Sequence, residues 1–147
     1  MKKFRFPLHS VATQRRMREA DRRERFATAV QTYVQAEEAL AAVRARIAGL
    51  QEVIAVERGG RFRPADQVAF MQALELEQVC LSAAAARVAE TGTAMENERQ
   101  AWIESRRDVR LIETLESKAR VGYRQAYERE EQALLDDRTN ALAARAV

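Results

Sequence analysis

Residues suited to catalysis or metal binding are few and scattered along this chain of 147 residues. The sequence holds one histidine, His9, and one cysteine, Cys80, which are too few for a zinc site. The glycine pair at 59–60 lacks the Lys-Ser/Thr that follows in a phosphate-binding loop. The adjacent carboxylates at 37–38 would point in different directions from a helix. We therefore predict a protein that is not an enzyme and has no cofactor, no metal and no small-molecule substrate.

Charge is the chemical property that the sequence does organise. Residues 1–25 hold nine basic groups against three acidic ones, a net charge of +6, although the whole chain carries only +3. Near the other end, residues 128–137 hold five acidic groups against the single Arg129. Solvated helix faces would give the same counts, so two interpretations stay open. The functional one is that the basic start is a surface for an acidic partner.

Composition limits the elements that can carry these charges. The chain has 28 alanines but only five glycines and two prolines, and the one strong break lies around the glycine pair and Pro64. We therefore predict an all-α fold: a single coiled-coil domain over 1–147, with one helix over about 9–57, a turn over 58–63 and a second helix over about 64–143. Left-handed glycines at 59–60 would cap the first helix, and Pro64 suits the first turn of the second.

A seven-residue repeat of apolar residues runs along both predicted helices, which indicates a long antiparallel two-helix coiled coil with a left-handed supercoil. The expected core residues are Phe26, Tyr33, Leu40, Ile47 and Ile54 in the first helix and Leu74, Leu81, Val88, Met95, Trp102 and Val109 in the second. Smaller residues run beside them: Ala29, Ala36, Val43 and Leu50, then Ala84, Thr91, Ser105, Ala119, Ala126 and Ala133.

The two predicted helices differ in length, about 75 Å against about 120 Å at about 1.5 Å per residue. If the chain folds back at the glycine pair, residue i faces roughly residue 122 − i, so Phe26 should lie near Met95. The first helix should end opposite about residue 115, leaving the last thirty residues without an intramolecular partner although their apolar stripe continues. Gly92, inside the second helix, indicates either a hinge or a close-packing position.

Other classes of protein fit less well. No run of about 18 apolar residues predicts a membrane span, and the start lacks the apolar core of a secretory signal. A basic stretch before heptads is also typical of a DNA-binding zipper, but Glu19, Asp21 and Glu24 interrupt it where phosphates would repel them. We therefore expect no nucleic-acid partner. The lone cysteine fits a reducing cytoplasm.

Four stretches together carry a resemblance to a known family. They are Lys3-Phe4-Arg5-Phe6-Pro7-Leu8 with Arg15-Arg16 and Glu19; Ala36-Glu37 with Leu40; Arg106-Arg107 before Leu111-Ile112-Glu113-Thr114-Leu115; and Tyr123 with Glu130-Glu131-Gln132-Ala133-Leu134-Leu135-Asp136-Asp137. In this order they resemble the FliJ family of bacterial flagellar type III export proteins. Ala133 and Asp137 depart from the usual Lys and Glu.

The resemblance implies a coiled coil similar to the γ-type stalk subunit of rotary ATPases. It also implies two partners, the hexameric flagellar export ATPase and the cytoplasmic domain of the membrane export gate, and a role in recycling export chaperones. The expected location is the cytoplasm, at the inner face of the cell membrane. The alternatives are the stalk of a virulence type III secretion system, which the Phe-x-Phe-Pro-Leu start disfavours, and an unrelated structural or DNA-binding coiled coil.

Two candidate surfaces follow when these partners are considered with the residues. For the ATPase we expect basic and aromatic residues from the open end: Arg15, Arg16, Arg18, Arg22, Tyr123 and Tyr127. For the export gate we expect the large apolar residues near the turn: Phe62, Phe70 and Met71. Phe70 lies four residues before Leu74, so we expect it beside the core rather than in its centre.

Overall fold

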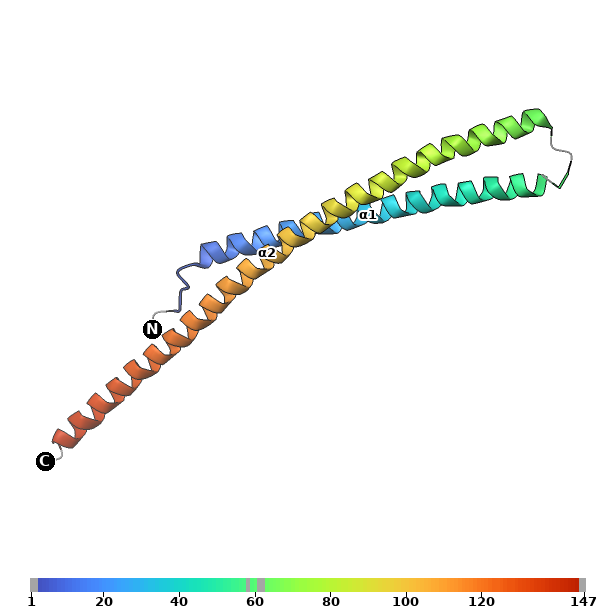
Figure 1. Ribbon diagram of the computed structural model, residues 1–147. Coiled ribbons are helices and arrows are strands. Elements are labelled where there is room, and N and C mark those ends of the chain that lie inside the picture. Colours follow the sequence, from blue (N-terminus) through green and yellow to red (C-terminus); the bar gives the residue numbers. More distant parts are fainter. Residues whose placement is uncertain (1–2, 58, 61–62, 146–147) are drawn as a thin grey trace. The chain divides into compact units, whose positions relative to one another are not determined.

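The computed structural model describes residues 3–57, 59–60 and 63–145, and two long helices account for nearly all of them. Helix α1 is His9–Glu57 and helix α2 is Pro64–Arg145. They run antiparallel and are joined near residue 60 (Figure 1). No strand occurs in these ranges. The prediction of an all-α, two-helix antiparallel coiled coil is confirmed.

Backbone hydrogen bonds define the ends of the helices. At the start of α1, the N–H of His9 donates to Phe6 O over 3.2 Å. At the other end, the N–H of Gly59 donates to Val56 O (3.2 Å) and the N–H of Gly60 to Glu57 O (3.0 Å), which are i to i−3 bonds that tighten a last turn. No glycine in the described ranges has a positive φ, so the predicted left-handed cap is wrong. Helix α2 begins at Pro64, where a missing N–H costs nothing.

The contacts divide the chain into two compact units. The hairpin unit is Asp21–Trp102, and the terminal unit combines Met1–Ala20 with Ile103–Val147. Both helices contribute to both units. That 1–147 behaves as a single domain stays a prediction.

In the hairpin unit, the two helices bury a narrow seam whose residues recur at alternating spacings of three and four. Ala36 and Val43 are its buried apolar residues, and Thr91 is a buried polar one. The other predicted core residues of this unit are half-buried: Phe26, Tyr33, Leu40, Ile47, Ile54, Leu74, Leu81, Val88, Met95 and Trp102. The seam is therefore a thin core, as expected when only two helices pack.

The register of the hairpin unit is close to the simple prediction: Arg46 pairs with Glu77 and Arg22 with Glu98, residue sums of 123 and 120 against the predicted 122. Phe26 stacks on Trp102, with ring centroids 5.5 Å apart and planes 16° from parallel. That Phe26 also lies near Met95 stays a prediction. Side chains on a helix lean toward its N-terminus, so in an antiparallel pair those of α1 lean away from the turn and those of α2 lean toward it. This lean lets the rings of Phe26 and Trp102 meet at a residue sum of 128, larger than that of the ion pairs.

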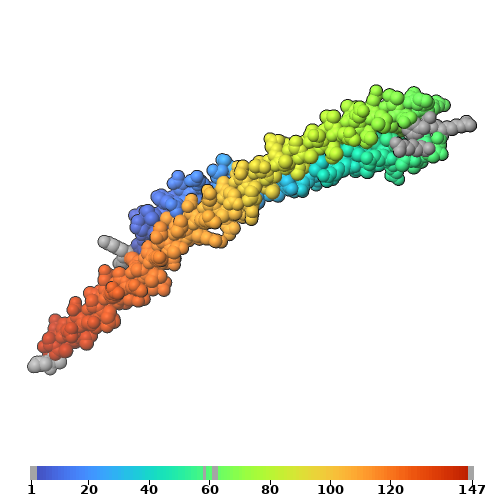
Figure 2. Space-filling view, viewed as in Figure 1, coloured from blue at the N-terminus to red at the C-terminus, as the bar shows by residue number. Residues whose placement is uncertain are grey.

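The terminal unit has a more complete core at one level. Ala12 and Ile112 are each only 1% exposed, and Ser105 is buried nearby in the seam of α2. Val109, one turn before Ile112, is half-buried, like the predicted core residues of the hairpin unit. From Glu128 onward every described residue of α2 is exposed. Figure 2 shows the red end of the chain with no other segment beside it.

Candidate functional site

The basic residues expected to meet the ATPase lie on α1, and three of the four already have partners within the chain. Arg15 donates from Nη1 to Asp108 O over 3.1 Å, and Arg22 lies 3.8 Å from the Glu98 carboxylate. Arg16 is shared between two carboxylates of α2. Arg18 is exposed and has no ion pair with the residues that the structure describes. Arg18 is therefore the arginine of this set best able to meet a partner.

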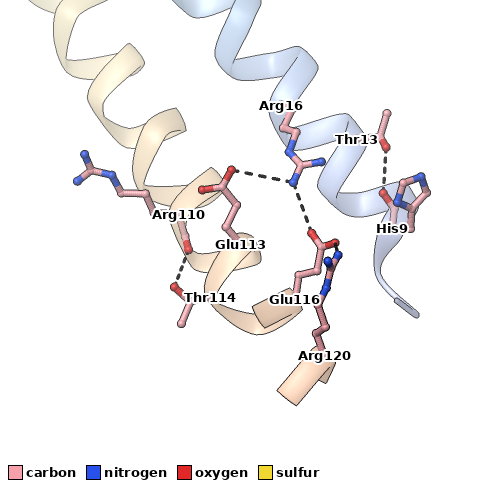
Figure 3. Close-up of polar contacts among 8 residues, drawn as sticks. All are labelled: His9, Thr13, Arg16, Arg110, Glu113, Thr114, Glu116 and Arg120. Atoms are coloured by element: carbon pink, nitrogen blue, oxygen red, sulfur yellow. Dashed lines mark hydrogen bonds and ion pairs between the residues drawn. The ribbon is translucent and has the colours of Figure 1, made fainter. Parts of the chain in front are cut away.

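Arg16 belongs to a charge network that joins α1 to α2 inside the terminal unit (Figure 3). Its guanidinium lies 4.0 Å from Glu113 Oε1 and 3.5 Å from Glu116 Oε2. Glu116 also pairs with Arg120, over 3.2 Å. The side chains of Arg16 and Glu113 are about half exposed, so each such pair contributes only about 0–1 kcal/mol. The network fixes the relative position of the two helices within this unit more than it stabilises the fold.

The predicted tyrosines lie on α2 beyond this network, and one of them has a partner that the sequence analysis did not predict. The ring of Phe4 packs against Tyr123, with centroids 5.4 Å apart and planes at 56°. Tyr123 stays 38% exposed, and Tyr127 one turn later is half-buried. The expectation that α2 has no intramolecular partner beyond residue 115 is therefore wrong as far as Tyr123. That expectation used the rise of a helix alone, whereas each non-helical residue before α1 can extend the chain by up to about 3.3–3.6 Å.

Near the turn, the residues expected to meet the export gate have different environments. Phe70 is half-buried and occupies a seam position, in the same seven-residue series as Ala84 and Thr91. Met71 is 47% exposed beside it. Phe62 lies outside the described residues. Met71 is thus the member of this set whose side chain is most open to a partner.

Two seam residues of α2 were not identified from the sequence. Glu77 and Glu98 occupy the series of small residues that includes Ala84 and Thr91, and a strict count by sevens would have found them. Glu77 accepts a 2.9 Å hydrogen bond from Arg46 Nε, which, together with the charge of Glu77, raises the pKa of Arg46. In the described part of the chain, the Oε2 atoms of both glutamates are buried without a hydrogen-bond partner. These carboxylates are polar interruptions of an otherwise apolar seam.

The terminal unit contains a hollow between the N-terminal residues and α2. It is open, has a volume of about 810 Å³, and is lined by Phe4, Arg5, Phe6, Pro7, His9, Ser10, Glu116 and Arg120. Within the ranges that the structure describes, no three histidine, cysteine or acidic residues lie together as metal ligands. Helices long and apolar enough to span a bilayer are also absent from those ranges. Charged and aromatic side chains on paired helices suit binding of another protein.

These features define a class, the two-helix coiled coils that expose charged and aromatic side chains for protein partners. A family comparison gives the particular identity: the family described as "Flagellar FliJ protein" matches residues 4–147, almost the entire chain. The protein belongs to the FliJ family. Comparisons with curated proteins and with solved structures gave no match. The family is a non-catalytic part of the flagellar type III export apparatus, so this chain is a flagellar export component.

Proposed function

We propose that this protein binds the hexameric flagellar export ATPase through the terminal unit, promoting assembly and activity of the ring. The observation that carries the proposal is the C-terminal part of α2, where Leu134 is 71% and Leu142 60% exposed on a helix that continues without a partner in the described residues. A helix that leaves apolar residues in water gains their burial when another protein covers them. A stalk entering a ring would supply that cover.

The distribution of charge also supports the terminal unit as the surface that binds the ATPase. Arg18 is exposed on α1, and the acidic stretch 128–137 lies farther along α2. A surface with both signs of charge fixes the orientation of a partner, and its basic part accelerates encounter with an acidic lining. We place the protein in the cytoplasm, at the inner face of the membrane that holds the export gate, where it would also take part in chaperone recycling.

Truncation tests the ATPase proposal. A variant lacking residues 119–147 should fail to stimulate ATP hydrolysis, while circular dichroism shows the helices of the hairpin unit retained. Tyr123→Ala with Tyr127→Ala should give a partial version of the same defect, because aromatic residues contribute most at such contacts. Val68→Ala, which shortens another exposed apolar side chain of α2, is the matched control and should stimulate fully. Full stimulation by the truncated protein would place the contact elsewhere.

The turn side of the hairpin unit is our proposed contact for the cytoplasmic domain of the export gate. Met71 supports this, being large, apolar and 47% exposed beside the half-buried Phe70. Met71→Ala should weaken binding to the isolated gate domain by about 1–2 kcal/mol, as loss of an interface anchor does, without lowering the melting temperature. Val79→Ala is the control, since Val79 is 68% exposed two turns away. Unchanged affinity of Met71→Ala would argue against this surface.

A further inference from the structure

The six residues Lys3–Leu8 precede α1, and we call them the N-terminal strap. Its first four residues, 3–6, have no regular secondary structure. Their burial alternates: Phe4 and Phe6 are half-buried, whereas Lys3, Arg5 and Pro7 are exposed. Alternation with period two is typical of an extended segment that turns one face toward a neighbour. The neighbour is α2, because the ring partner of Phe4 is Tyr123. The strap therefore lies over part of the α2 surface that we assign to the ATPase.

Among the described residues, Phe4 is the aromatic side chain through which the strap contacts α2. The Phe4 ring lies 5.4 Å from the Tyr123 ring, and the Arg120 guanidinium lies 5.7 Å from the Phe4 centroid. The backbone hydrogen bonds at this end, His9 N–H to Phe6 O and Ala12 N–H to Leu8 O, stay within the N-terminal chain. In the described residues, none joins the strap backbone to that of α2. Between the described residues, the Phe4 contacts with Tyr123 and Arg120 would have to break for the strap to leave.

The space around the contact indicates that the strap is attached at its end and not packed along its length. The hollow of about 810 Å³ has strap residues on one side and Glu116 and Arg120 of α2 on the other. Protein interiors are close-packed, so an open space of this size shows that the strap is not packed against α2 along its length as a core segment would be. At Gly122, next to Tyr123, an added Cβ would meet no atom within 4 Å, so the neighbouring surface is also open.

We propose that the N-terminal strap is an autoinhibitory contact: Phe4 holds it over Tyr123 in the free protein, and it must lift before a partner can cover this stretch of α2. The inference rests on the proposed function, because the partner it excludes is the export ATPase. A ligand that binds only the open form has its apparent affinity reduced by the fraction of molecules that are open. Weakening the Phe4 contact should therefore strengthen binding of the protein to the ATPase.

Binding of the full-length chain to the purified ATPase tests this inference. Phe4→Ala should bind about two- to tenfold more tightly than the parent, the range that loss of one aromatic pair gives in the closing equilibrium. Leu8→Ala, which shortens an exposed apolar residue of the same strap, should bind like the parent. Equal or weaker binding by Phe4→Ala overturns the inference, while binding by the parent leaves the proposed function intact.

A second measurement on the isolated protein keeps the two proposals distinguishable. With Tyr33 and Tyr127 changed to Phe, nitration of Tyr123 reports its accessibility, because the sequence has only three tyrosines. Phe4→Ala should raise the nitration rate in this background, and Leu8→Ala should not. If the parent fails to bind the ATPase, the proposed function is wrong. If nitration is unchanged by Phe4→Ala, the strap does not cover Tyr123 and the inference is wrong whether or not the ATPase binds.

Discussion

At the scale of single residues, the seam carboxylates carry the clearest energetic consequence. Glu77 has a side chain only 21% exposed, and its Oε2 atom is buried without a hydrogen-bond partner in the described residues. Its partner Arg46 is 52% exposed, so water can solvate that guanidinium if the glutamate is removed. The two ends of this pair are therefore not equivalent. Replacing a partly buried charge by an apolar side chain of similar volume is often stabilising.

We predict opposite effects when either partner is replaced by leucine. Glu77→Leu should raise the free energy of unfolding by about 1 kcal/mol or more, because it removes a poorly satisfied carboxylate from the seam. Arg46→Leu should lower it by about 1–3 kcal/mol, because that carboxylate then loses the hydrogen bond that Arg46 donates. Urea unfolding followed by circular dichroism measures both. Glu75→Leu, at an exposed position two residues earlier, is the control.

A fall in stability for Glu77→Leu as large as that for Arg46→Leu would contradict this account. It would mean that the ion pair contributes more than the desolvation of the carboxylate costs. The pair of Glu98 with Arg22 differs, because Arg22 is 29% exposed and Glu98 33%, so removing this glutamate would leave a half-buried guanidinium without its carboxylate.

At the scale of elements, the glycines inside α2 occupy different environments. At Gly92 an added Cβ would lie 3.4 Å from Tyr33 Cε2 of the facing helix, whereas at Gly122 it would meet no atom within 4 Å. Gly92 thus lies where the two helices approach closely, which supports close packing over a hinge. Gly122 has no packing reason of this kind.

Alanine substitutions distinguish the two positions. Gly122→Ala should stabilise the protein by about 1 kcal/mol, the difference in helix propensity. Gly92→Ala should gain less, because its methyl group meets the Tyr33 ring, and Gly92→Leu should destabilise by forcing that ring to move. Melting temperatures of the three variants measure this. A stabilising Gly92→Leu would show that Tyr33 is not held against this position.

The elements also separate what sequence can predict from what it cannot. Seven-residue spacing predicted both helices and placed residues such as Leu40 and Leu81 in the seam, because an exposed apolar stripe of that period is unstable in water. An apolar pattern did not identify Glu77, because a charged residue at a seam position does not belong to an apolar repeat, although it keeps the spacing of seven. It also could not find the Phe4 contact, since a non-helical strap has no helical period. That some of the four candidate arginines pair with glutamates of the second helix follows from their position, but which of them do so does not follow from spacing alone.

At the scale of the whole molecule, charge is separated along the sequence, with +6 in residues 1–25. The field of such a distribution steers an acidic partner, and its effect falls as salt shortens the Debye length. Arg18→Glu should slow association with the ATPase several-fold at low salt and less at high salt, with helicity unchanged. Arg44→Glu, also exposed but within the hairpin unit, makes the same charge change and should have less effect. Equal association rates for parent and Arg18→Glu at low salt would refute steering.

The thin seam has a consequence for how the protein responds to temperature. Among the described residues, only Ala12, Ala36, Val43 and Ile112 are buried apolar side chains. The heat-capacity change of unfolding follows the apolar area that becomes exposed, about 12–15 cal/mol/K per residue in ordinary globular domains. A chain that hides so little apolar area in its folded state must fall below that range. Its stability curve is correspondingly flat, so cooling weakens this export component far less than it weakens a compact enzyme of equal length.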